Sequence, residues 1–122
     1  MSKYSGRTIR NLDFQGDLWP ILDQWAATNN YILIASGQNS RTYQLGSMLL
    51  SQRMLKISFS GNGYVLEAWI KVRHTQRIGN LGLIMPSDLK IDGGGRWRKI
   101  NRKLAREEIN PFLASLGELP IN

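Results

Sequence analysis

The first amphipathic pattern in the chain predicts a helix over residues 17–29. Its apolar residues recur at i, i+3, i+4 and i+7, the spacing of one helical face; they are Leu18, Ile21, Leu22 and Trp25. Asp17 is expected to cap the N-terminus with its carboxylate, and Pro20 falls in the first turn, where a missing N–H costs little. Asn29 and Asn30 should end the helix, because asparagine tolerates the left-handed conformation.

Alternating apolar and polar residues predict a β-hairpin in the middle of the chain. Its strands are expected over residues 54–60 and 64–73, and Gly61-Asn62-Gly63 between them suits a tight turn. The predicted apolar face carries Leu55, Ile57, Phe59, Tyr64, Leu66, Ala68, Ile70 and Val72. The opposite face mixes charged side chains with Val65 and Trp69.

Shorter patterns predict further strands around this hairpin. Residues 8–14 alternate loosely and favour a short edge strand. Residues 31–36 are apolar on both faces, which is typical of a central strand, and residues 41–45 would be its partner. Residues 81–91 are interrupted by Pro86 and favour an edge strand or an irregular extended segment.

Residues 96–116 have the composition of a helix, but Pro111 lies inside them. Because proline lacks the N–H that closes a helical turn, we expect a break there. In one arrangement Asn110 caps a short second helix and Gly117 ends it. The side chains expected in the core are Ile109, Phe112, Leu113 and Leu116, with Trp97, Ile100 and Leu104 holding the first part of the helix to the sheet.

The order of these elements predicts a two-layer α+β fold in a single domain spanning residues 1–122. Consecutive strands joined by short turns form an antiparallel sheet of about five strands, and only one face of such a sheet needs covering. A helix from the N-terminal half and the C-terminal helix would cover that face. The alternative is a sheet curled around the C-terminal helix, which can leave a ligand cavity.

Composition narrows the chemistry that the chain can support. Without cysteine there is no disulfide framework, thiol nucleophile or cysteine-ligated metal. His74 is the only histidine, and a surface loop is its expected setting. No phosphate-loop or dinucleotide-binding motif occurs, so residues 93–95, a run of three glycines, are interpreted as a linker. The sequence identifies no catalytic residue, metal site or cofactor, and it favours a non-enzymatic protein.

The apolar runs also bear on location. None approaches the roughly 20 residues that a membrane-spanning helix needs. Residues 1–4 contain no apolar stretch of the kind found in secretory signals. Together with the lack of cysteine, these features favour a cytoplasmic protein.

Positive charge is concentrated in one segment of the chain. Residues 71–106 hold ten Lys or Arg residues and two acids, a net charge of +8 in a chain that totals +7. Cations gathered on one surface bind phosphates by releasing counterions, and aromatic side chains among them can stack on bases. The predicted polyanion-binding residues are Lys71, Arg73, Arg77, Arg96, Arg98, Lys99, Arg102, Lys103 and Arg106, with Trp69 and Trp97 for stacking or an interface. The partner would be nucleic acid or an acidic protein.

Three other interpretations stay open. Basic side chains on a solvated helix face need no partner. Trp69, exposed on the outward face of the hairpin, would suit a protein interface, including that of a homodimer. A curled sheet would suit a small-ligand carrier, with Trp25, Tyr64 and Phe112 lining the cavity.

Overall fold

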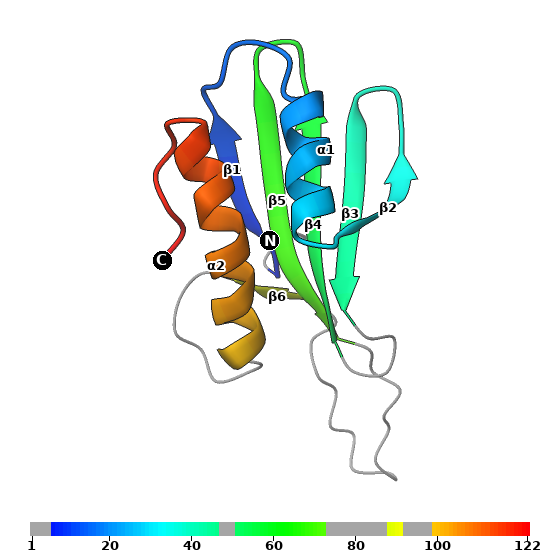
Figure 1. The fold of residues 1–122 in the computed structure, drawn as a ribbon, viewed down its shortest axis with the longest axis vertical. Helices are drawn as coiled ribbons and strands as arrows, with labels where there is room; N and C mark the ends of the chain where they lie inside the picture. The colour runs from blue at the N-terminus through cyan, green and yellow to red at the C-terminus, as the bar shows by residue number, and fades with distance from the viewer. Residues whose placement is uncertain (1–5, 47–50, 73–87, 92–98) are drawn as a thin grey trace, which may run out of the picture.

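A computed structural model describes residues 6–46, 51–72, 88–91 and 99–122, which form a two-layer α+β fold (Figure 1). The elements are β1 (Thr8–Leu12), α1 (Trp19–Thr28), β2 (Ile32–Ser36), β3 (Ser40–Gly46), β4 (Ser51–Phe59), β5 (Tyr64–Val72), β6 (Asp88–Lys90) and α2 (Lys99–Ser115). All strands pair antiparallel, and both helices lie on one face of the sheet. The predicted fold class is confirmed.

The sheet runs in the order β1-β5-β4-β3-β2. β1 and the short β6 share one edge of β5: β1 pairs with its first five residues, and β6 pairs with Trp69, Ile70 and Lys71. Where these two strands meet, the hydroxyl of Thr8 accepts a hydrogen bond from the backbone N–H of Ile91, 3.1 Å away. Because β1 stands at the end of the strand order, the prediction of an edge strand near the N-terminus is confirmed.

The predicted hairpin is formed by β4 and β5. Gly61 in its turn has a φ of +91°, which glycine adopts without steric strain. The register places Leu55 opposite Ala68 and Ile57 opposite Leu66, and all four side chains are fully buried under the helices. Burying an aliphatic side chain of this size contributes about 1.5–3 kcal/mol, so this face is a main source of stability.

α1 uses most of the predicted stripe, because Leu18, Leu22 and Trp25 are buried while Ile21 remains 37% exposed. Its N-terminus differs from the prediction. The helix begins at Trp19 and has no side-chain cap. Asp17 instead accepts a hydrogen bond from the N–H of Trp19, at 3.2 Å, one residue before the position where it would cap the helix.

α2 runs through Pro111 without the break that the sequence predicted. Pro111 is exposed, so the carbonyl that loses its partner can turn to solvent, while Ile109 and Phe112 on either side are buried against the rest of the fold. Asn110 caps no helix: its side-chain amide donates to the carbonyl of Ile121 (3.0 Å) and accepts from the N–H of Ile121 (2.7 Å).

The other predictions for this helix have mixed outcomes. Gly117 follows the helix with a φ of +78° and ends it, as expected. Leu113 is buried and Leu116 packs against the core, which confirms that part of the apolar stripe. Leu104 is 38% exposed, so it does not hold the helix to the sheet; Ala105, which is 1% exposed, lies on the buried side instead.

The prediction of a central strand at residues 31–36 is wrong. β2 lies at the end of the sheet, next to β3, and all five of its residues are exposed. A strand that is apolar on both faces is usually covered on both faces. Here residues 32–36 instead form an exposed edge strand of an antiparallel sheet. Figure 1 shows β2 projecting away from both helices.

Candidate functional site

The described part of the chain places the predicted basic residues on two sides of the sheet. Arg102, Lys103 and Arg106 belong to α2. Lys71 follows Ile70 on β5, and Ile70 is buried under the helices, so Lys71 points to the opposite face. Lys99 begins α2. Outside the described residues lie His74, residues 93–95 and the predicted binding residues Arg73, Arg77, Arg96, Trp97 and Arg98.

The three cations in the middle of α2 have different surroundings. Lys103 is exposed, and Glu107 one turn further along the helix is exposed as well. Arg106 donates from Nη1 to the carbonyl of Ile91 at 2.6 Å, which links α2 to the residue after β6. Arg102 has Nε and Nη1 buried with no hydrogen-bond partner in the structure as described. Of the three, Lys103 is exposed, whereas Arg102 and Arg106 are partly buried.

Trp69 lies on the outward face of the sheet, as predicted, but it is only 5% exposed. The guanidinium carbon of Arg7 sits 3.7 Å from the centre of its ring, and Arg7 also forms a 3.0 Å ion pair with Glu67. The expectation of an exposed tryptophan anchor is therefore wrong. Arg7 precedes β1, and β1 lies beside β5, so this contact depends on strand order rather than on the local sequence.

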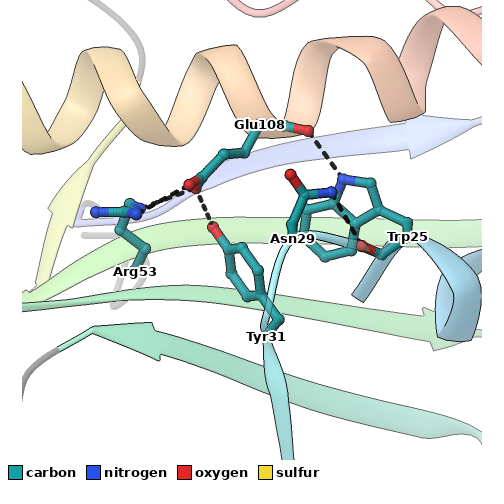
Figure 2. Close-up of polar contacts among 5 residues, drawn as sticks. All are labelled: Trp25, Asn29, Tyr31, Arg53 and Glu108. Atoms are coloured by element: carbon teal, nitrogen blue, oxygen red, sulfur yellow. Dashed lines mark hydrogen bonds and ion pairs between the residues drawn. The ribbon is translucent and has the colours of Figure 1, made fainter. Parts of the chain in front are cut away.

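Glu108 on α2 is the centre of a polar network between the helices and the sheet (Figure 2). Its carboxylate accepts two hydrogen bonds from Arg53 on β4, at 2.8 and 2.9 Å, and one from the hydroxyl of Tyr31, at 2.7 Å. Its backbone carbonyl accepts from the indole of Trp25 at 2.8 Å. Burial, followed by the negative charge of Glu108, raises the pKa of Tyr31 far above its ordinary value. Tyr31 therefore stays protonated and donates at neutral pH, and the network links α2 to α1 and β4.

A second polar cluster joins α1 to β3. Arg41 donates from Nη1 to both carboxylate oxygens of Asp23 at 2.7 Å, and the hydroxyl of Tyr43 donates to one of them. The hydrogen bond from Tyr43 is the main cause that lowers the pKa of Asp23. The guanidinium of Arg41 also lies over the ring of Trp19, 4.9 Å from its centre. Asp23 and Arg41 thus neutralise each other at the surface.

A hollow of about 330 Å³ lies between α1 and α2. Trp25 and Phe112 line it, with ring centres 5.6 Å apart, and no charged side chain does. This differs from the predicted cavity between sheet and helix. Tyr64, the third residue expected there, instead hydrogen-bonds near the start of α1, donating to the carbonyl of Gly16 at 2.8 Å.

The free edge of β2 is the most distinctive surface of the described residues. Ile32 is 67% exposed, Leu33 46% and Ile34 48%. The register with β3 shifts between Leu33 and Ala35, which leaves Ile34 unpaired as a bulge. In the part of the chain that the structure describes, β2 pairs with β3 alone and no helix lies in front of it (Figure 1). We refer to the unpaired side of residues 32–36 as the β2 edge.

The β2 edge also lies in the longest uncharged stretch of the chain. Residues 24–40 contain no Asp, Glu, Lys or Arg, although 20% of the chain is charged. Sequence reasoning assigned this apolar run to the interior, so the site was missed. The signal that could have found it is position in the chain: β2 follows a helix and precedes its hairpin partner β3, and among the described strands β3 is its single neighbour.

Comparison of the chain with models of known protein families finds no match, and comparison with curated proteins finds none either. Over the described ranges, neither helix is long and apolar enough to cross a bilayer. The same residues contain no group of three His, Cys, Asp or Glu side chains that could hold a metal ion.

Proposed function

We propose that this chain is a single, non-enzymatic interaction domain that binds a protein partner along the β2 edge. An edge strand carries N–H and C=O groups that are free to pair with another strand, and many interaction domains bind an extended segment in this way. The observation that supports this function is the exposure of all five residues of β2, three of them large aliphatics.

Natural sheets avoid unwanted pairing by placing charges, lysine or proline on their edge strands. β2 has none of these residues. The features of β2 that limit pairing are its short length of five residues and the bulge at Ile34. Exposed aliphatic groups that lie together on a surface mark sites of association, so the composition of β2 suits binding better than solvent exposure.

The apolar character of β2 is not explained by folding. The core cluster contains residues from both helices and from strands β1, β3, β4 and β5, and no residue of β2 belongs to it. Tyr31, immediately before the strand, is the last buried residue in this part of the chain before Tyr43. The aliphatic side chains at Ile32, Leu33 and Ile34 are therefore available for a partner.

A stability measurement tests whether the aliphatic side chains of β2 contribute to folding. The triple variant Ile32→Thr, Leu33→Thr and Ile34→Thr places β-branched residues, which favour strands, at all three positions but removes their apolar surface. We expect the free energy of unfolding in urea to change by less than about 1.5 kcal/mol, as for exposed positions. The control Ile57→Ala, in the core, should lose about 2–5 kcal/mol. A loss in the triple variant as large as in the control would assign these side chains to the fold and refute the proposal.

Polyanion binding by the basic segment and a cytoplasmic location remain predictions. The exposed charge of Lys103 favours the first, while Lys71 would act from the other side of the sheet. The salt dependence of association distinguishes this function from binding at the β2 edge, as discussed below.

A further inference from the structure

We infer that the partner of the β2 edge is the β2 edge of a second copy of this chain, paired antiparallel across a two-fold axis. This inference rests on the proposed function and names its partner. In such a dimer the two sheets become one continuous sheet, with β2 of each protomer at its centre.

Two-fold symmetry requires a surface that is complementary to itself. A residue on the axis faces its own copy, and its neighbours face other residues of the same strand, so a charge at the axis would be placed opposite a like charge. A strand of Ile32, Leu33, Ile34, Ala35 and Ser36 meets its own copy without such repulsion. The aliphatic side chains of both copies then lie beside each other and leave water.

The distribution of charge favours approach along this edge. Each copy carries a net charge of +7, so two copies repel each other over most orientations. The uncharged stretch of residues 24–40 is flanked by Asp23 and Arg41. These two residues are paired with each other, with Arg41 Nη1 2.7 Å from the carboxylate of Asp23. The stretch of chain around β2 therefore carries no net charge, so we expect repulsion between copies to be weakest along this edge.

The arrangement of the fold leaves room for a second copy. β2 lies at the opposite end of the sheet from β1, and α2 packs against β4 and β5, away from β2 (Figure 1). A second sheet can continue the first without meeting either of the two described helices. The strand is short and contains the bulge at Ile34, so the paired segment is limited in length. We therefore expect a dimer that depends on protein concentration.

Complementary charge substitutions test this dimer directly. Light scattering from about 1 μM to about 1 mM should show the mass of the native chain rising from 13.9 kDa toward twice that value. Ile34→Lys and Ile34→Glu should each remain at 13.9 kDa, because each places like charges across the axis. An equimolar mixture of the two variants, at low ionic strength, should recover the doubled mass. Circular dichroism checks that each variant is folded, and Ile32→Lys replaces Ile34→Lys if that variant is not.

The control is Lys103→Glu on the exposed side of α2, which lowers the net charge and should not weaken the dimer. A native chain that stays at 13.9 kDa up to about 1 mM overturns the inference. So does a dimer that survives Ile34→Lys, or a mixture that fails to associate. If the threonine triple variant keeps its stability while the native chain is monomeric, the β2 edge serves a different protein and only the second copy is excluded.

Discussion

Arg53 on β4 and Glu108 on α2 form a two-point ion pair, with Nε 2.8 Å from one carboxylate oxygen and Nη2 2.9 Å from the other. Both side chains are less than one-fifth exposed. The pair connects residues 55 positions apart in the sequence and fixes the middle of α2 above the sheet. The hydroxyl of Tyr31 shares the carboxylate, so the start of β2 is held by the same group.

Glu108→Gln should destabilise the protein by about 2–3 kcal/mol, because it leaves the guanidinium of Arg53 partly buried without its charged partner. Urea unfolding measures this change. Glu107→Gln is the matched control, since Glu107 is exposed on the same helix, and it should stay within about 0.5 kcal/mol of the native chain. Equal effects of the two substitutions would contradict the role assigned to Glu108.

Tyr43→Phe should change how stability depends on pH above pH 10. Burial, followed by the hydrogen bond to Asp23, raises the pKa of Tyr43 from 10.0 to about 12 in the folded chain. Below pH 10 the hydroxyl is protonated in both states and its full contribution is present. As pH rises from 10 to 12 the unfolded chain loses the proton first, so the folded state loses stability.

Thermal unfolding at pH 8, 10 and about 11.5 measures this effect. The melting temperature of Tyr43→Phe should fall less steeply over that window than that of the native chain. The variant keeps Tyr31, whose pKa is also raised by folding, so part of the pH dependence of the melting temperature remains. A variant with the same slope as the native chain would show that the pKa of Tyr43 is not raised by folding.

Pro111→Ala should stabilise the protein by about 1 kcal/mol. Alanine restores the N–H that Pro111 lacks inside a continuous helix, and it has the higher helix propensity, while the looser unfolded chain offsets part of the gain. Chemical denaturation measures the difference. Loss of stability would indicate that the helix needs the proline ring, for example where it lines the hollow between α1 and α2.

Salt separates the two modes of association. Self-association of a chain with a charge of +7 through a neutral edge should strengthen as ionic strength rises, because salt screens the repulsion. Polyanion binding should weaken steeply with salt, because counterions are released on binding. Sedimentation measures self-association, and retention on heparin measures polyanion binding. Charge reversal at Arg98, Arg102 and Lys103 should reduce retention on heparin without weakening self-association. If dimerisation and heparin binding both weaken as ionic strength rises, pairing through the β2 edge is contradicted.

Elements with strong periodicity could be predicted from the sequence. The alternation around Gly61 gave the hairpin of β4 and β5, and the stripe from Leu18 to Trp25 gave α1, because these patterns depend on local backbone geometry. The break at Pro111 was predicted from one missing hydrogen bond. It does not occur, because buried residues on both sides of the proline keep the helix in place.

The parts that could not be predicted depend on which strands are neighbours. The exposure of β2 follows from its position at the end of the sheet, and the cover on Trp69 comes from Arg7, which lies 62 positions earlier in the chain. The ion-pair partner of Glu108 could not be predicted from the residues along its own helix. Its partner is Arg53 on another element, a choice set by the packing of α2 on β4.

Amide hydrogen exchange in β2, measured at increasing protein concentration, tests the central claim most directly. We predict that exchange at residues 32–36 slows as the native chain is concentrated, because their free backbone groups become paired, while exchange in β4 stays the same. Ile34→Lys should show no such slowing. Exchange rates in β2 of the native chain that are independent of concentration would contradict the account.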